Sequence, residues 1–275
     1  MSQMFQFDPA PTRPTPGTTR LRLLVTAKVA PRPTEWQEET VHAIGLSTDP
    51  HRPGWIRLYP VSPRDLTGEE RFQTYDLISV DAEPARDDPR RESWRPVIRT
   101  LTRELHLKQW HRRREWLDPY AEVSMCRLDQ DARERAGGRS IALVRPSDVD
   151  ELVLTAHPGW SAEQRRRLWA YLHRVGPGEP ADAGALESPR FSGAYRYRCR
   201  DRECQGHQQP IGDWEFVALQ RRLAGVSDAE LRQALAATFL DRMCGPDRAF
   251  AFYVGRGPGS DREFRVLGGY WPPKW

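Results

Sequence analysis

Short runs of alternating apolar and polar residues, separated by Pro and Gly, dominate the first 85 residues and constrain the fold most. The run 21–29 places Leu21, Leu23, Val25 and Ala27 on one face, as a half-buried strand requires. Further runs are found at 39–46, 55–61 and 75–83. Short strands at this spacing are typical of β-barrels and β-sandwiches. The sequence therefore predicts a β-rich, barrel-like or sandwich N-terminal half.

Helical patterns interrupt and follow these strands. Residues 99–117 are predicted to form a helix, and 140–146 and 152–156 to form short strands. A helix is also predicted from Ser161, which with Gln164 has the spacing of a capping box, to a stop at Gly176. The Pro-, Gly- and Ala-rich stretch after it predicts a linker.

The last 85 residues combine strands, helices and a cysteine-containing loop. A strand at 194–200 leads into the loop, and a helix should begin after Asp213 as N-cap. A second helix should start at Ser227, which forms a capping box with Glu230, and a hairpin should close the chain. We expect an α+β fold, divided into a flexible arm (1–19), a β-rich domain with helical insertions (20–176), a linker (177–190) and a smaller zinc-knuckle α+β subdomain (191–275).

Composition narrows the class of protein. With 38% hydrophobic and 29% charged residues the chain resembles globular proteins, and it has no apolar run near the roughly 20 residues that a membrane helix needs. Its first 20 residues lack the features of a secretory signal, so we expect a cytoplasmic protein. All but three of its 42 basic residues are arginine, the better side chain for bidentate contacts to phosphate, and a net charge of +4 permits nucleic-acid binding.

Two cysteines and a histidine lie close together in the sequence C-x4-C-x2-H, as Cys199, Cys204 and His207. Thiolate and imidazole are the ligands that Zn²⁺ prefers, and Gly206 would let the backbone turn tightly beside them. A structural zinc site needs a fourth ligand. Cys244 is the first candidate, and His157, His173, Asp213 or water are the alternatives. The simpler possibility is an ordinary loop with a buried Cys199.

Two carboxylates follow the loop, Asp213 and Glu215. As a catalytic pair they would share a cation or a proton, but residues two apart diverge on a helix. Asp213 is more simply explained as an N-cap, with Glu215 favourably placed near the positive end of the helix dipole.

Arginine and aromatic residues recur in the N-terminal half and predict a nucleic-acid-binding surface, in which aromatic rings stack on bases and arginines contact phosphates. Trp55, Arg57 and Tyr59 share one face of a strand, and the segment 106–114 adds further basic side chains. The same residues are also consistent with a structural role, as core aromatics and paired charges. The candidate nucleic-acid-binding residues are Lys28, Trp55, Arg57, Tyr59, Arg90, Arg91, Trp94 and Arg95.

These segments resemble a family of uncharacterised bacterial proteins. The shared patterns are VTAK, GWIRLYPV, DDPRRESWRP, YRCRDRECQGH…IGDWE and FYVG…VLGGYWPPK, which together span most of the chain. The resemblance implies no catalytic role. The residues that lie within family-like segments are Lys28, Arg57, Tyr59, Arg90, Glu92, the metal-loop residues Cys199, Cys204 and His207, and Asp213.

Three functions fit these observations. The first is a zinc-stabilised protein that binds DNA or RNA, as an accessory in nucleic-acid processing or defence. The second is a metal-dependent hydrolase or nuclease, using an open metal site or Asp213 and Glu215. The third is a protein-interaction scaffold that uses the aromatic residues. The sequence does not decide whether the protein is an enzyme, and it contains no G-x-S-x-G, H-E-x-x-H or Walker A motif.

Overall fold

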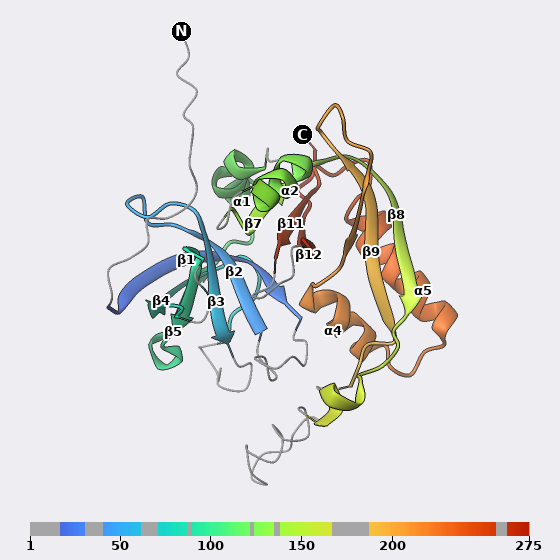
Figure 1. The fold of residues 1–275 in the computed structure, drawn as a ribbon, viewed down its shortest axis with the longest axis horizontal. Coiled ribbons are helices and arrows are strands. Elements are labelled where there is room, and N and C mark those ends of the chain that lie inside the picture. The colour runs from blue at the N-terminus through green and yellow to red at the C-terminus, as the bar shows by residue number, and fades with distance from the viewer. Residues whose placement is uncertain are drawn as a thin grey trace.

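A computed structural model describes residues 17–30, 41–61, 71–86, 88, 90–121, 124–134, 138–166, 187–256 and 263–274. The fold is α+β with a β-barrel in the N-terminal half, which confirms the predicted class and selects the barrel over the sandwich. Figure 1 shows the barrel on one side and a β8–β9 pair with helices on the other, with β11 and β12 between them. Among the described helices, none is long and apolar enough to cross a membrane.

Five strands close the barrel in the order β1-β2-β3-β5-β4, because β4 also pairs with β1. A sixth strand, β6, adds to the outer edge of β4. Their bounds are β1 Thr19–Val29, β2 Val41–Ser47, β3 Trp55–Val61, β4 Asp76–Pro84, β5 Ser93–Pro96 and β6 Thr102–His106.

The alternation in β1 changes partway along the strand. Leu21, Leu23 and Val25 pack inside the barrel as the period predicts. The pairing of β1 with β2 shifts register between Val25 and Ala27, and a bulge of this kind moves later side chains to the other face. Ala27 therefore packs against the second half of the molecule instead of inside the barrel.

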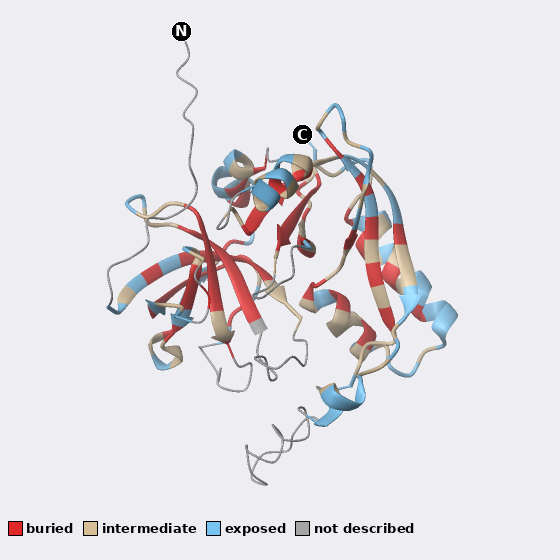
Figure 2. Ribbon diagram, viewed as in Figure 1, coloured by how far each residue is buried: buried red, intermediate tan, exposed pale blue. Residues whose placement is uncertain are grey.

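The second half is built on two three-stranded sheets, ordered β12-β11-β7 and β10-β9-β8. Their strands are β7 Ile141–Val144, β8 Pro146–Ala156, β9 Phe191–Cys199, β10 His207–Pro210, β11 Ala251–Gly255 and β12 Arg265–Tyr270. Burial alternates along β9, with Phe191, Tyr195, Tyr197 and Cys199 buried (Figure 2). β7 and β8 precede the segment 177–190 that was expected to be a linker, yet they pair with β11 and β9, which follow it. Residues 167–186, including most of that linker, lie outside the described residues, as do 1–16 of the expected arm.

Helices pack against the strands of both halves. The longer ones are α1 Trp110–Leu117, α2 Met125–Glu134, α4 Trp214–Arg222 and α5 Asp228–Ala236; a π-helix, η5 Ala237–Arg242, continues α5, and short 3-10 turns span Ile98–Thr100 and Asp118–Tyr120. α4 and α5 begin at Asp213 and Ser227 as predicted, and α5 has its full capping box. The capping box of Ser161 and Gln164 also forms, at the start of a helix described only as far as residue 166.

The prediction of one helix over 99–117 is wrong in its first part, because 102–106 forms β6 and the helix starts only at Trp110. Side-chain partners on neighbouring strands favour the extended form. The carboxylate of Glu104 accepts hydrogen bonds from Arg22 at 2.6 Å and from Ser79, and His106 Nδ1 lies 2.8 Å from the buried Asp76. These contacts to distant residues override the local helical preference.

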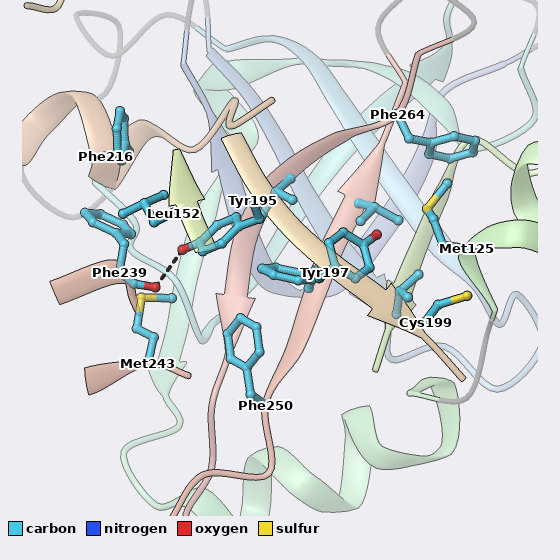
Figure 3. Close-up of a cluster of buried hydrophobic side chains, with 14 of the residues drawn as sticks. Met125, Leu152, Tyr195, Tyr197, Cys199, Phe216, Phe239, Met243, Phe250 and Phe264 are labelled. Carbon is cyan, nitrogen blue, oxygen red and sulfur yellow. Dashed lines mark hydrogen bonds between the residues drawn. The ribbon is translucent and has the colours of Figure 1, made fainter. Parts of the chain in front are cut away.

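The core of the second half contains many aromatic side chains. Figure 3 shows Tyr195, Tyr197 and Cys199 of β9 in contact with residues from other elements. These are Met125 of α2, Phe216 of α4, Phe239 of η5 and Phe250, the residue before β11. The Tyr195 hydroxyl donates a 2.7 Å hydrogen bond to the Phe239 carbonyl, so the buried hydroxyl is satisfied (Figure 3). This packing fixes β9, and with it the position of Cys199 at its end.

Candidate metal centre

Four side chains that can bind a metal ion meet where β9 ends, β10 begins and α2 starts. They are Cys126, Cys199, Cys204 and His207, and their ligand atoms all lie within 4.8 Å of one another. Cys199 is the last residue of β9, His207 the first of β10, and Cys126 lies in the first turn of α2. This Cys3His cluster can hold a metal ion.

The distances match a tetrahedral site. Cys126 Sγ lies 3.6 Å from Cys199 Sγ and 3.5 Å from His207 Nε2, which in turn lies 3.3 Å from Cys204 Sγ. With bonds of about 2.3 Å to sulfur and 2.0 to 2.1 Å to nitrogen, a tetrahedral zinc would set its ligands about 3.8 Å apart for two sulfurs and about 3.6 Å apart for sulfur and nitrogen. These three separations are within about 0.3 Å of the values that such an ion requires, and all four donor atoms lie within 4.8 Å of one another.

The loop between Cys199 and His207 is organised by its own hydrogen bonds. Asp201 accepts the backbone N–H groups of Glu203, at 3.1 Å, and of Cys204, at 3.2 Å. Gly206 has φ +101°, a left-handed conformation that glycine adopts without strain, and a side chain here is disfavoured. A tight turn was expected here because Gly206 precedes His207 in the sequence.

Contacts outside the cluster hold α2 against the loop. Ser124, just before α2, donates to Asp201 Oδ2 at 3.2 Å and lies 3.5 Å from Cys199 Sγ. Gln209 accepts a hydrogen bond from the buried Tyr197 hydroxyl and donates to Met125 Sδ at 3.1 Å. Such supporting contacts fix the orientation of ligands.

The thiols of Cys199 and Cys126 differ in acidity. Burial raises the pKa of Cys199, but hydrogen bonds from the Cys126 backbone and Ser124 outweigh it and lower the pKa to about 6. Burial and the neighbouring Cys199 raise the pKa of Cys126 well above its usual value. Three close sulfurs repel one another as thiolates, and a bound cation would relieve that repulsion.

The structure places Cys126, and not Cys244, beside the three residues of the sequence motif. Cys244 lies beyond the end of η5, where its thiol faces the Phe239 carbonyl at 3.5 Å. His157 and Asp213 also lie outside the cluster, and His173 lies outside the described residues. Sequence spacing could not single out Cys126, because it is 73 residues from Cys199 and joins the site only through the packing of α2.

The carboxylates Asp213 and Glu215 have separate roles. Asp213 is the N-cap of α4, accepting the Glu215 N–H at 2.9 Å, and it is buried. Burial raises the pKa of Asp213 to about 7. The Glu215 side chain is half exposed and lies 4.0 Å from Lys28 Nζ. Among the described residues, neither belongs to a group of three or more metal-ligating side chains.

The residues expected to form a nucleic-acid surface are divided by the fold. Trp55, Arg57 and Trp94 are no more than 5% exposed, so they cannot stack on bases or contact phosphates from outside. The expectation that alternate residues of β3 face solvent is wrong for Trp55 and Arg57, because both faces of the strand are covered, one by the barrel core and one by the second half.

The other candidates lie nearer the surface. Tyr59 stacks on His42 with ring centroids 4.2 Å apart, Arg90 is bound to Asp88, and Lys28 lies near Glu215. Arg91 and Arg95 are exposed.

Two family models match the chain. The model of a domain of unknown function (DUF8757) matches residues 121–275, and that of a second domain of unknown function (DUF8758) matches residues 19–119. No curated protein matches the chain. The solved structure described as "Crystal structure of the tetrameric p202 HIN2" is similar over 96% of this chain and 98% of that chain, with 8% identity and a TM-score of 0.30. A TM-score this low carries no argument about this protein. The first family match covers more than half of the chain, and the protein therefore belongs to the DUF8757 family.

Proposed function

We propose that the protein is a zinc-stabilised nucleic-acid-binding protein. The observation that supports zinc binding is the Cys3His cluster: the ligand atoms of Cys126, Cys199, Cys204 and His207 lie within 4.8 Å of one another. Three sulfurs and one imidazole are a donor set that favours zinc over the harder magnesium and calcium ions, which prefer oxygen.

The zinc would have a structural role. All four tetrahedral positions are supplied by the protein, whereas a catalytic zinc keeps a position open for water or substrate. The ion would join α2 to the β9–β10 hairpin, and these elements also meet in the core around Met125 and Tyr197. The closed donor set therefore favours a stabilising centre over the hydrolase alternative.

A matched pair of cysteine variants tests this centre. Cys126→Ser should lower the zinc affinity at least about 100-fold, since losing a ligand should exceed the 10- to 100-fold cost of losing a supporting contact. Cys244→Ser is the control, because its thiol lies elsewhere, and it should retain one zinc per chain. Zinc content and the visible spectrum of the cobalt-substituted protein provide the readouts. Equal losses in the two variants, or a wild-type protein that binds no metal, would contradict the proposal.

The nucleic-acid half rests on the exposed face of α1. Arg112 and Trp116 are four residues apart on this helix, so they share one face, and Trp116 is 40% exposed. Lys108, two residues before the helix, and His111 are also exposed, and Glu115 is the acidic residue among them. An exposed tryptophan beside cations supplies stacking for a base and charge for the phosphates around it. We call these five residues the α1 face.

Binding to labelled single-stranded DNA and RNA, measured over a range of salt concentrations, tests the α1 face. Arg112→Glu should weaken binding and reduce the salt dependence by about one ion, whereas Trp116→Ala should weaken binding with little change in that slope. Arg198→Glu, on the outward face of β9, is the matched control because it reverses an equally exposed charge elsewhere. If Arg198→Glu weakens binding as much as Arg112→Glu, or if the wild type binds neither strand, the proposal fails.

A further inference from the structure

A second feature of the C-terminal half is a cavity of about 320 Å³ on the side of α4. Its walls come from the segment 157–160 after β8, the start of β9, the β10–α4 connection and α4 itself. Small-molecule sites span roughly 300 to 1,000 Å³, so the volume suits a small ligand. We call it the Trp160 pocket, defined by Trp160, Phe191, Phe216, His157, Gln164 and Arg221.

The pocket is lined mainly by aromatic and aliphatic side chains. Trp160, Phe191 and Phe216 supply rings, and Ile211 and Val217 add aliphatic surface. Phe191 and Phe216 are buried in the adjoining core, which fixes their positions before any ligand arrives. Phe191 and Phe216 are only 2% and 3% exposed, so they form the floor of the pocket, and the partly exposed Trp160 ring is the surface that can stack on a flat, aromatic ligand.

Polar groups in the pocket are held in place by local hydrogen bonds. His157 Nδ1 accepts the Gly159 N–H at 3.0 Å, so a neutral His157 ring carries its proton on Nε2. The His157 ring also lies edge-on to Trp160, with centroids 5.2 Å apart. The Gln164 amide is fixed through the capping box, its oxygen accepting the Ser161 N–H at 2.8 Å. Oriented donors of this kind can read the edge of a heterocyclic base.

The charged side chains of the pocket indicate the charge of the ligand. The lining includes Arg221 and His157 and, among the described residues, no Asp or Glu. The hollow of about 400 Å³ beside the metal centre differs, because Asp129 and Glu263 line it and oppose an anion. Arginine is the side chain that best matches the oxygens of a phosphate. The Trp160 pocket therefore favours an anionic ligand.

We propose that the Trp160 pocket binds one nucleotide, with its base against Trp160 and its phosphate near Arg221. This inference deepens the proposed nucleic-acid binding and rests on it for the source of the ligand. The nucleotide is either a free mononucleotide or one unit of a bound strand, since both present the same base and phosphate.

Calorimetric titration of the full chain with the common ribonucleoside and deoxyribonucleoside 5′-monophosphates tests the pocket. We expect saturable binding of at least one of them, at least tenfold weaker for the corresponding nucleoside without phosphate. Trp160→Ala and Arg221→Gln should each weaken binding at least tenfold, and Trp160→Phe and Arg221→Lys should restore much of it. Unchanged zinc content and circular dichroism establish that the variants fold.

Further measurements distinguish a free mononucleotide from a unit of a bound strand, and the Trp160 pocket from the α1 face. Competition between the mononucleotide and a labelled strand, together with a weaker strand affinity in Trp160→Ala, identifies a strand unit; mononucleotide binding without such competition identifies a free nucleotide. Arg112→Glu should leave mononucleotide binding unchanged, so a failure of the α1 face does not count against the pocket. The inference is overturned if no mononucleotide binds at millimolar concentration, or if Trp160→Ala and Arg221→Gln bind it as tightly as the wild type.

Discussion

Asp213 is a buried carboxylic acid that caps a helix. Capping favours the ionised form of its side chain, whereas burial favours the protonated form. The cap contributes about 1 kcal/mol through the hydrogen bond from the Glu215 N–H, while burial favours the protonated form and raises the pKa to about 7. The backbone around Asp213 bridges to Val29 at the end of β1, so the residue lies where the two halves of the molecule meet.

The raised pKa predicts a pH-dependent stability. Between about pH 4, where an unfolded Asp ionises, and pH 7 the folded state holds one more proton, so stability falls as pH rises through this range. Asp213→Asn keeps a capping oxygen but does not titrate. We therefore expect the stability of Asp213→Asn relative to wild type to increase from pH 4 to pH 7, by up to about 1.4 kcal/mol per pH unit, and to stay constant above that.

Urea unfolding at several pH values measures this difference, with Glu215→Gln as the control because the Glu215 side chain is half exposed. A difference between Asp213→Asn and wild type that does not vary with pH would show that Asp213 is ionised throughout.

At the scale of elements, a buried charged network connects the barrel to the β7–β11 sheet. Arg57 of β3 donates to Ser140 Oγ at 3.3 Å and to the Arg256 carbonyl at 2.8 Å, and Arg90 donates to the same carbonyl at 2.8 Å. Asp88 accepts from Arg90 Nε at 2.7 Å and lies 3.8 Å from Arg57 Nη1. Although burial opposes it, Arg90 lowers the pKa of Asp88 to about 2, so Asp88 neutralises much of this positive charge.

Removing the negative charge of Asp88 should destabilise the folded protein. Asp88→Asn would remove the carboxylate that pairs with Arg90 and lies 3.8 Å from the buried Arg57, which predicts a loss of about 3 to 5 kcal/mol in the free energy of unfolding. Asp81→Asn breaks the more exposed pair with Arg20 and should cost less than about 1 kcal/mol. Chemical denaturation of the two variants gives the comparison, and similar costs for both would show that the network does not stabilise the fold.

How far sequence predicts each element depends on where its determinants lie. α5 and α4 begin where Ser227 and Asp213 predict, because a capping interaction involves residues two or three apart. β6 was missed because its partners, Asp76 and Arg22, are distant in sequence. Likewise, three cluster residues lie within one loop and follow from spacing, but Cys126 reaches them only through the tertiary packing of α2.

In the whole molecule, a third buried cluster joins the two halves, in addition to the barrel interior and the core of the second half. Leu24, Ile44 and Trp55 of the barrel belong to the same buried cluster as Tyr253 and Leu267 of the second half. Trp55 meets Tyr253 edge-on, with ring centroids 6.1 Å apart. The boundary between the two matched family domains, near residue 120, therefore crosses a continuous interior.

A shared core predicts cooperative unfolding. Amides of β4 in the barrel and of β9 in the second half should lose protection from hydrogen exchange at the same denaturant concentration, because the cluster that joins the halves is buried only while both are folded. Hydrogen exchange with peptide-level mass spectrometry follows both strands in one sample. Protection of β4 that persists after β9 has exchanged would mean that the barrel is an independent unit.

X-ray absorption at the zinc edge of the purified protein measures the coordination of the metal ion itself. We predict one zinc per chain with three sulfur neighbours at about 2.3 Å and one nitrogen at about 2.0 to 2.1 Å. Protein without bound metal, or a zinc surrounded only by nitrogen and oxygen, would contradict it.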